Sequence, residues 1–267
     1  MVEPAPKVIV DAWLSRLGLT ADLPMTLASL TTIIRAHLDR IPFENLTVFC
    51  GGVPEIGIDA LATKILHAKR GGYCVELNPL LCAGLRGLGF DARLCMARVL
   101  WQRDVPGPRS HCLCIVRLDG ADYLVDVGFG GPGPTEPFML GSDSPDLRTE
   151  HRAGLGTVLS RQVAEGDWRD LYAFTDEVTT MSDVQAGNWL AATLPGSLFT
   201  RTLIVTRHIG DTRLVLEDAT FRKFAKGRAP EVEVLQTPEA VLSCLREAFD
   251  LDPPSELTGA LNDKGIF

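Results

Sequence analysis

One cysteine of this chain lies in a context that favours a reactive thiolate. It occurs in the stretch Arg70-Gly71-Gly72-Tyr73-Cys74-Val75-Glu76-Leu77-Asn78, where two glycines allow a tight turn and the close approach of other groups. Apolar residues at steps of three and four follow, and this spacing predicts a helix. A cysteine near a helix N-terminus, with an arginine four positions earlier, lies where the ionised thiol is favoured. Taken alone, the pattern is more typical of a buried cysteine after a turn.

Two residues further along the chain can complete this chemistry. His111 opens an apolar stretch of period two, and Asp126 ends the next such stretch. Asp119-Gly120 between them is a strong hairpin signal, and residues around such a turn pair when their numbers add to about 239. Asp126 then lies two positions from the partner of His111, on the same face of the sheet.

Together the three side chains can supply the nucleophile, the base and the orienting group of a catalytic triad. His111 would take the proton from Cys74, and Asp126 would fix the imidazole tautomer and stabilise the imidazolium. Taken singly, a histidine in a strand is usually a polar residue whose hydrogen bonds are made within the fold, and an aspartate before glycine usually forms a turn. Their joint occurrence with a cysteine on a glycine turn favours a Cys-His-Asp triad.

The composition limits the class of protein. The chain has 267 residues, 46% of them hydrophobic, so it can bury a core in one large domain or in two to three small ones. No apolar stretch approaches the ~20 residues that span a bilayer. An acid and two prolines occupy the N-terminus, where a signal peptide has basic and then apolar residues. We therefore expect a soluble cytoplasmic protein without a membrane partner.

The charge is negative overall but unevenly distributed. A formal net charge of −8 argues against a general nucleic-acid binder. Residues 201–230 nevertheless hold seven basic residues against three acidic ones, a local charge of +4, which leaves −12 for the rest of the chain. This segment is either a solvated charged face or a local site for a phosphorylated ligand.

The seven cysteines show no metal-binding spacing. No Cys-x-x-Cys pair occurs, and Cys112 and Cys114 face opposite to His111 if the three lie in one strand. A zinc site is therefore not expected, and no metal is implied. Most of the cysteines lie in apolar runs, so reduced thiols with Cys74 as the essential one fit best.

The pattern along the chain changes from helical to extended. Two helical stripes fall within residues 8–40, and a third helix is expected over 56–69. After Gly89 the apolar period becomes two, and residues 128–134 form a loop rich in glycine and proline. The expected strands are 91–101, 110–118, 121–127, 157–164, 169–177, 202–207, and 213–217 paired with 219–224, followed by a helix over 237–249.

The chain resembles the arylamine N-acetyltransferases, a family of acetyl-CoA-dependent cysteine enzymes. Four stretches carry the resemblance: Ile41-Pro42-Phe43-Glu44-Asn45-Leu46, the cysteine stretch 70–78, Ser110-His111 with the strand after it, and Asp126-Val127-Gly128-Phe129-Gly130-Gly131. Weaker similarities are Asp11-Ala12-Trp13-Leu14 with Arg16, and Asn188-Trp189 followed by Pro195-Gly196-Ser197-Leu198-Phe199.

The resemblance implies an α+β fold whose Cys, His and Asp are arranged as in papain and the transglutaminases. It implies an N-terminal helical bundle over residues 1–89 that carries the cysteine. A central β-barrel-like domain over 90–195 would carry the histidine and the aspartate, and a C-terminal α/β lid would cover 196–267.

The resemblance also implies roles for particular residues. Cys74, His111 and Asp126 take the catalytic roles, and Arg70 and Glu44 resemble a supporting ion pair. The acceptor pocket would be lined by Phe43, Val99 and Phe129. Coenzyme A would contact Trp101, Ser110, Gly130 and Phe199, as in some bacterial members of the family.

Three features depart from the family pattern. Pro79 removes a helix donor and disfavours helical geometry just before it, so the first turn after Cys74 is expected to be kinked. Cys112 and Cys114 occupy positions where plain aliphatic residues are expected. The C-terminal segment is short, so an open coenzyme cleft is expected.

The implied activity is a ping-pong acetyl transfer from acetyl-CoA, through a thioester on Cys74, to an aromatic amine, hydrazine or hydrazide. Two other classes share the triad. One is an amide synthase of polyketide biosynthesis in the same family, which activity with free acetyl-CoA distinguishes. The other is a cysteine hydrolase, against which the Asp126–Gly131 stretch argues. The sequence does not indicate the oligomeric state or the physiological amine.

Overall fold

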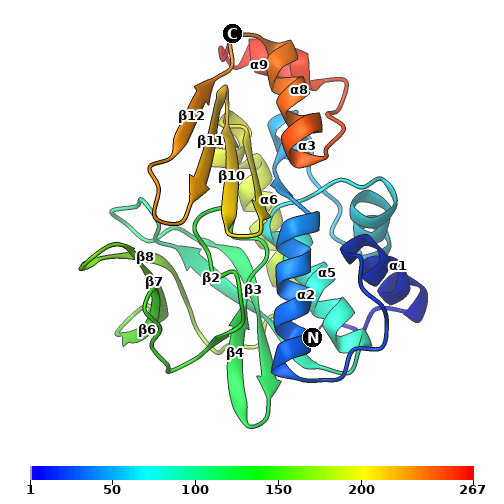
Figure 1. Cartoon of the computed structure of the whole chain (residues 1–267), viewed down its shortest axis with the longest axis vertical. Helices are drawn as coiled ribbons and strands as arrows, with labels where there is room; N and C mark the ends of the chain where they lie inside the picture. The colour runs from blue at the N-terminus through cyan, green and yellow to red at the C-terminus, as the bar shows by residue number, and fades with distance from the viewer. Residues whose placement is uncertain (1) are drawn as a thin grey trace.

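The computed structural model describes residues 2–267, in which a group of N-terminal helices lies beside two antiparallel sheets (Figure 1). Figure 1 shows these helices in blue and cyan, a curled half-barrel of strands in green, and a second sheet in yellow and orange near the C-terminus. The helices are α1 (Lys7–Leu17), α2 (Leu27–Arg40), α3 (Leu46–Phe49), α4 (Ile58–Leu61), the π-helix η1 (Ala62–His67), α5 (Cys74–Gly87), α6 (Met181–Thr193), α7 (Leu198–Arg201), α8 (Pro238–Phe249) and α9 (Leu257–Asp263).

The curled sheet has seven strands in the order β5-β4-β3-β2-β8-β7-β6. Its hairpin β3–β4 has the register expected from its turn, since pairs run from Cys114 with Val125 to Leu118 with Ala121. The strands are β2 (Asp91–Val99), β3 (Arg109–Leu118), β4 (Ala121–Val125), β5 (Phe138–Met139), β6 (Leu147–Arg152), β7 (Gly156–Ala164) and β8 (Asp167–Phe174).

The five-stranded sheet, here called the C-terminal sheet, takes one strand from the N-terminal part of the chain. Its order is β1-β9-β10-β11-β12, and β1 pairs Phe43 with Thr206 and Glu44 with Val205. The segment just before the cysteine turn is therefore bonded to the C-terminal sheet. The strands are β1 (Phe43–Glu44), β9 (Ile204–Ile209), β10 (Thr212–Glu217), β11 (Thr220–Ala225) and β12 (Glu231–Val234).

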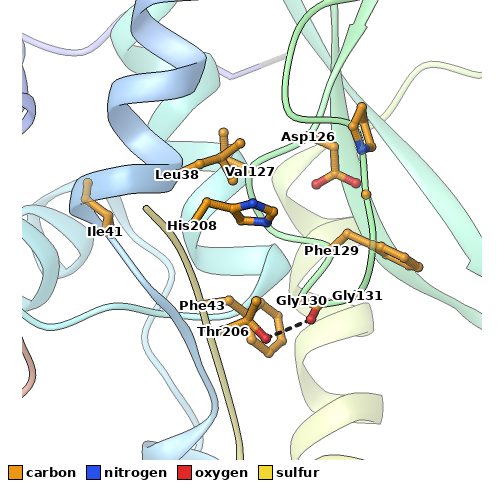
Figure 2. Close-up of a pocket in the computed structure, with 12 residues that line it drawn as sticks. Leu38, Ile41, Phe43, Asp126, Val127, Phe129, Gly130, Gly131, Thr206 and His208 are labelled. Atoms are coloured by element: carbon orange, nitrogen blue, oxygen red, sulfur yellow. Dashed lines mark hydrogen bonds between the residues drawn. The ribbon is translucent and has the colours of Figure 1, made fainter. Parts of the chain in front are cut away.

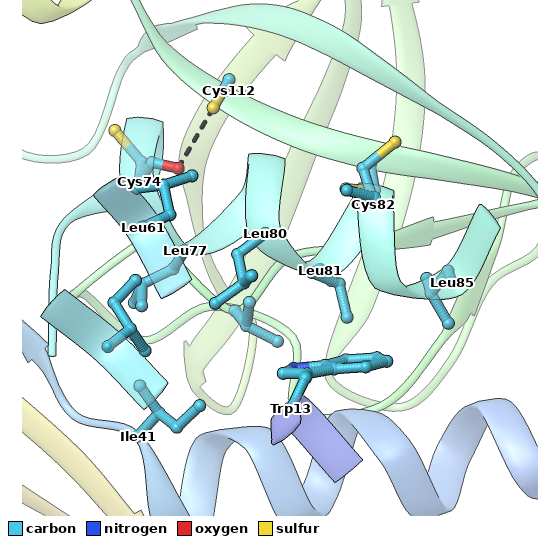
Figure 3. Close-up of a cluster of buried hydrophobic side chains, with 14 of the residues drawn as sticks. Trp13, Ile41, Leu61, Cys74, Leu77, Leu80, Leu81, Cys82, Leu85 and Cys112 are labelled. Carbon is cyan, nitrogen blue, oxygen red and sulfur yellow. Dashed lines mark hydrogen bonds between the residues drawn. The ribbon is translucent and has the colours of Figure 1, made fainter. Parts of the chain in front are cut away.

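Helix α5 lies at the centre of the largest apolar cluster. Its leucines at three- and four-residue steps are fully buried, and Figure 3 shows Trp13 of α1 beneath them. The helix continues through Pro79, although that residue cannot donate to the carbonyl of Val75. The expected disturbance at this proline therefore does not end the helix. Packing on both sides holds it, because every residue from Cys74 to Leu85 is buried.

The sequence pattern did not indicate several elements. Strands β6 and β12 are edge strands. Strand β6 is mostly polar and shows no apolar alternation, whereas β12 alternates glutamate and valine over only four residues, all of them exposed. Helix α6 buries small or polar residues such as Gly187 and Asn188, which weakens its stripe. The helix expected over 56–69 begins at Ile58 and changes to a π-helix at Ala62. Helix α9 and the short strand β5 were also not expected. Among residues 2–267, no helix is long and apolar enough to cross a membrane.

We predict that Gly84→Ala destabilises the protein. A Cβ at this position of α5 would lie 2.6 Å from two ring atoms of Trp13, which is fully buried. Such overpacking costs about 1–3 kcal/mol. The matched control is Gly259→Ala in α9, where a Cβ would meet nothing within 4 Å, and helix propensity predicts a gain of about 0.5–1 kcal/mol. Urea unfolding curves measure both changes; equal effects of the two substitutions would contradict the packing argument.

Candidate active site

Cys74 is the first residue of α5, and the turn before it requires glycine. A Cβ on Gly71 would lie 2.0 Å from the carbonyl oxygen of Pro42, and the Gly72 carbonyl accepts a hydrogen bond of 2.9 Å from Glu44. The helix N-terminus is closed by Glu76, whose carboxylate accepts a hydrogen bond from the backbone N–H of Tyr73 at 3.2 Å. The turn therefore fixes the position of a cysteine that is only 4% exposed.

Four charged residues form a buried network behind this turn. The Arg70 guanidinium donates two hydrogen bonds of 2.8 and 3.0 Å to one oxygen of Glu44, which is fully buried. The Lys64 ammonium lies 2.7 Å from Glu76 and 3.6 Å from Glu44. These cations keep the pKa of Glu44 below its usual value, although burial acts to raise it. The resemblance implied the contact between Arg70 and Glu44. In the structure this ion pair holds the cysteine turn against β1.

His111 and Asp126 meet across the end of the β3–β4 hairpin. His111 Nε2 and Asp126 Oδ2 lie 2.7 Å apart, and both residues are buried. Strand β4 ends at Val125, so Asp126 is the first residue after the strand. His111 also lies close enough to Cys74 for each group to shift the pKa of the other. The structure thus brings together the three side chains that the sequence singled out.

Asn78 holds the aspartate from the side of the helix. Its Nδ2 donates to Asp126 Oδ1 at 2.9 Å and to the carbonyl of Cys112 at 2.7 Å, and its Oδ1 accepts from the Val127 N–H at 3.1 Å. Asn78 lies one helical turn after Cys74, so both point towards β3. We did not predict a role for Asn78 from the sequence, although its four-residue spacing from Cys74 places both on one face of the helix.

Two aromatic rings enclose the imidazole. The centroids of Phe129 and Tyr172 lie 5.5 and 5.1 Å from that of His111, and the two rings contact each other edge to face. Tyr172 lies in β8, opposite Val99 of β2. No local motif marks this tyrosine, because its approach to His111 depends on a long-range strand pairing.

The electrostatics favour a charged cysteine and a charged histidine. The neighbouring Cys112 thiol is the largest influence on the pKa of Cys74, and with His111 it outweighs burial and lowers the value to about 5. Burial acts to lower the pKa of His111, but Asp126 and Cys74 raise it to about 10. The two groups therefore form a thiolate–imidazolium pair between these values. Arg70, which we expected to favour the thiolate, is instead neutralised by Glu44.

Cys112 contacts the cysteine turn directly. Its sulfur lies 3.1 Å from the carbonyl oxygen of Cys74 (Figure 3), and Cys114 makes the corresponding contact with the Asn78 carbonyl at 3.3 Å. Burial raises the pKa of the Cys112 thiol well above its ordinary value, so this group stays a proton donor. The two cysteines thus join β3 to α5, on the strand face opposite to His111.

Three of the expected pocket residues line one small cavity. Phe43, Phe129 and Gly130 surround a volume of about 20 Å³ together with Thr206 and His208 of β9 (Figure 2). Figure 2 shows the Thr206 hydroxyl pointing at Gly130, whose carbonyl accepts its hydrogen bond at 2.8 Å. Gly130 has a φ of +72°, and a Cβ there would lie 2.8 Å from the Phe43 ring, so a glycine is required.

The other expected pocket residues do not line this cavity. Val99 ends β2, and Trp101 follows in a turn that packs on the core of the curled sheet. Ser110 is next to the cysteine, since its carbonyl lies 3.6 Å from Cys74 Sγ. Phe199 contacts Tyr73 and Phe43, at centroid distances of 5.5 and 6.0 Å. Among residues 2–267, no group of three or more His, Cys, Asp or Glu could hold a metal ion.

Comparison with known proteins agrees with this fold and shows the family. The profile of a family described as N-acetyltransferase matches residues 26–257. The chain is 37% identical over 257 residues to an arylamine N-acetyltransferase of Mycolicibacterium smegmatis, covering 91% of this chain and 92% of the relative. It is 33% identical to the arylamine N-acetyltransferase / N-hydroxyarylamine O-acetyltransferase of Salmonella typhimurium, covering 85% and 83%.

Solved structures show the same fold. The arylamine N-acetyltransferase of Salmonella typhimurium superposes with a TM-score of 0.90 at 29% identity, covering 97% of this chain and all of that one. The Mycobacterium marinum enzyme in complex with CoA superposes with a TM-score of 0.86 at 30% identity, covering 96% and 97%. The matched profile assigns the chain to the N-acetyltransferases as a class. More narrowly, the chain belongs to the arylamine N-acetyltransferase family, which confirms the resemblance drawn from its four stretches.

We predict that Cys112→Ala raises the pKa of Cys74 from about 5, because it removes the thiol that stabilises the thiolate. A hydrogen bond to a charged group is worth about 1.5–3 kcal/mol, or roughly 1–2 pKa units. Thiolate absorbance in the ultraviolet, titrated from acid to neutral pH, measures the midpoint.

The matched control for this titration is Cys114→Ala. Cys114 lies on the same strand and face, but its thiol contacts the Asn78 carbonyl and not Cys74. Its removal should leave the Cys74 midpoint in place. If both variants, or neither, shift the midpoint, Cys112 is not the donor that tunes the thiolate.

Proposed function

We propose that this chain transfers the acetyl group of acetyl-CoA to arylamines, arylhydrazines or hydrazides by a ping-pong mechanism through a thioester on Cys74. The observation that carries the proposal is that His111, hydrogen-bonded to Asp126, lies beside Cys74 at the start of a buried helix. The names of the relatives, and the CoA complex of the Mycobacterium marinum enzyme, support the choice of donor and acceptor.

In the first half-reaction the Cys74 thiolate attacks the thioester carbonyl of acetyl-CoA. Backbone N–H groups at the cysteine turn are candidate donors to the developing oxyanion. The carbon–sulfur bond of the coenzyme breaks, and the His111 imidazolium gives its proton to the departing CoA thiolate. Acetyl-Cys74 and a neutral His111 remain.

In the second half-reaction the amine nitrogen attacks the acetyl carbon of the thioester. His111 takes the proton that the nitrogen loses, and Asp126 stabilises the imidazolium that forms. The bond to Cys74 breaks, which releases the acetylated amine and restores the thiolate–imidazolium pair. Each half-reaction thus moves one proton through the same imidazole nitrogen, the one that Asp126 leaves free.

The remaining roles extend the same proposal. Phe43, Val99 and Phe129 would line the acceptor pocket, whereas Trp101, Ser110, Gly130 and Phe199 would contact coenzyme A. Residues 1–89 would act as the helical bundle, 90–195 as the β-barrel-like domain and 196–267 as the lid, with the Cys-His-Asp arrangement of papain and the transglutaminases. The seven cysteines of residues 2–267 are all free, which supports a cytoplasmic location.

Two other activities use the same three residues. An amide synthase of the same family would take its acyl group from a carrier-bound polyketide, and a cysteine hydrolase would pass it to water. The names of the relatives favour the acetyltransferase.

The decisive experiment is single-turnover acylation by acetyl-CoA without any amine. We expect a burst of CoA equal in amount to the enzyme, with a mass increase of one acetyl group on the peptide that contains Cys74. The Cys74→Ala variant should give no burst. If CoA appears only when an arylamine is added, direct transfer replaces the thioester; if free acetyl-CoA does not react but a carrier-bound acyl group does, the chain is an amide synthase.

We also predict that Asp126→Asn slows acylation by about 10⁴-fold, by analogy with aspartate removal from other triads. Asp126 Oδ1 accepts from Asn78 and from the Gly128 N–H, so an asparagine would keep its oxygen there and point its NH₂ group at His111 Nε2. The imidazole would then carry its proton on the nitrogen that faces Cys74. Rapid-mixing kinetics measure the rate.

The control for this variant is Asp122→Asn on β4, which disturbs ion pairs with Arg117 and Arg93 at the surface. It should acylate at the wild-type rate. A folded Asp126→Asn variant that acylates like the control would refute the role of the aspartate.

A further inference from the structure

A second thiol lies against the backbone of Cys74. Cys112 belongs to β3, is fully buried and occupies a position where the sequence led us to expect a plain aliphatic residue. Its sulfur lies 3.1 Å from the carbonyl oxygen of Cys74, and Figure 3 shows it directed at the first turn of α5. The two bonds between this oxygen and Cys74 Cα measure about 1.2 and 1.5 Å, so the Cys112 sulfur lies within about 6 Å of that Cα.

Hydrogen bonds hold the strand and the helix together at this contact. Asn78 of α5 donates through Nδ2 to the Cys112 carbonyl at 2.7 Å, and its own carbonyl accepts from the Cys114 thiol at 3.3 Å. Disulfides join cysteines whose Cα atoms lie about 4.4–6.8 Å apart, so a thiol must pack against the backbone of its partner before the bond can form. Cys112 packs on Cys74 in this way in the folded protein.

The two thiols differ in charge, which decides the order in which they react. The Cys112 thiol and His111 lower the pKa of Cys74 to about 5, so Cys74 is a thiolate at neutral pH. Peroxides oxidise thiolates and leave protonated thiols almost untouched. In the proposed function an acyl donor reaches Cys74, so a molecule as small as hydrogen peroxide reaches it as well. Cys74 is therefore the first cysteine to be oxidised.

Cys112 stays protonated for as long as Cys74 is a thiolate. Burial, followed by the neighbouring Cys74, raises the pKa of the Cys112 thiol well above its ordinary value. Conversion of Cys74 to a neutral sulfenic acid removes the negative charge beside Cys112, and with it one of the causes that keep this thiol protonated. The second thiol thus becomes easier to ionise at the stage when it faces a sulfenic acid.

We propose that Cys112 is a resolving cysteine, which traps oxidised Cys74 as a disulfide within the same chain and thereby makes inactivation by peroxide reversible. In the first step the Cys74 thiolate attacks hydrogen peroxide. A sulfur–oxygen bond forms, the oxygen–oxygen bond breaks, and the second oxygen leaves as hydroxide. This hydroxide takes the proton of the His111 imidazolium and becomes water, so the sulfenic acid of Cys74 and a neutral His111 remain.

In the second step the sulfur of Cys112 attacks the sulfur of the sulfenic acid. The disulfide forms, the sulfur–oxygen bond breaks, and the oxygen leaves as water with the proton of Cys112. Two molecules of a small thiol later reduce the disulfide and leave as their own disulfide, which restores both cysteines. The inference goes beyond the proposed function and needs only the thiolate at Cys74, not a particular acyl donor.

A second pair of cysteines along the same helix and strand provides an internal comparison. Cys114 contacts the Asn78 carbonyl as Cys112 contacts that of Cys74, and Cys82 follows Asn78 by one turn of α5. Both Cys82 and Cys114 are fully buried, and burial raises the pKa of the Cys114 thiol well above its ordinary value. This second pair has no imidazolium beside it, so we expect no oxidation to begin there.

The test exposes the protein to hydrogen peroxide, blocks free thiols with N-ethylmaleimide and maps tryptic peptides without reduction. Trypsin leaves Cys74 and Cys82 in peptide 71–86, and Cys112 and Cys114 in peptide 110–117. We expect these two peptides joined, with a mass two hydrogens below their sum, in protein that remains a single chain. The joined pair should persist in Cys114→Ala and disappear in Cys112→Ser; the opposite pattern would assign the disulfide to Cys82 and Cys114 and overturn the proposal.

Recovery after peroxide tests the protective role. Cys112→Ser keeps a hydrogen-bond donor beside Cys74 but cannot form the disulfide. After treatment with dithiothreitol, most of peptide 71–86 should again carry unoxidised Cys74 in the wild type and in Cys114→Ala. In Cys112→Ser we expect less than about a tenth, because Cys74 proceeds to the sulfinic and sulfonic acids, which thiols do not reduce.

The wild-type protein alone can also refute the inference. If its Cys74 gains oxygen without any joined peptides, or is not oxidised at all, Cys112 does not resolve it. Equal recovery of Cys74 in the wild type and in Cys112→Ser would contradict the protective role in the same way. Because each readout is a mass, a protein that forms the disulfide but releases no CoA from acetyl-CoA would refute the proposed function and leave this inference in place.

Discussion

The buried carboxylate of Asp126 is the constraint on which the arrangement of this protein depends. A charge of this kind, 2% exposed, is tolerated in a protein interior only when partners surround it. His111 on β3, Asn78 on α5 and the N–H of Gly128 supply those partners. The strand, the helix and the loop are therefore fixed relative to one another by a single side chain. Because Cys74 lies one turn before Asn78, satisfying the aspartate also delivers the thiol to the imidazole.

A second buried carboxylate secures the other side of the turn. Glu44 accepts hydrogen bonds from the Leu46 N–H at 2.7 Å and from Arg70, with Lys64 nearby. Glu44 also belongs to β1, which pairs with β9 of the C-terminal sheet. The glycine turn is therefore anchored to that sheet as well as to the helices. Removing one partner of such a buried pair costs about 3–5 kcal/mol, because it leaves an uncompensated charge.

The sequence predicted the parts of the site that depend on local rules. The turn at Asp119-Gly120 set the register of β3 and β4, and this register brought His111 and Asp126 together. The four-residue spacing from Cys74 to Asn78 likewise predicts that both side chains lie on one face of the helix. The edge strand β6 followed no apolar alternation, and the alternation of the exposed β12 is only four residues long, because little of either strand is buried. Tyr172 reaches His111 only through the long-range pairing of β2 with β8, which no local pattern encodes.

The pKa of Cys74 shows that a charged residue near a site in the sequence does not by itself determine the charge of the reactive group. Arg70 is close in sequence and positively charged, yet Glu44 neutralises it, and a neutral thiol from Cys112 has the larger influence on the pKa. Carboxylates that hold the reacting centre must be satisfied in the folded state at all times, because their partners fix the geometry.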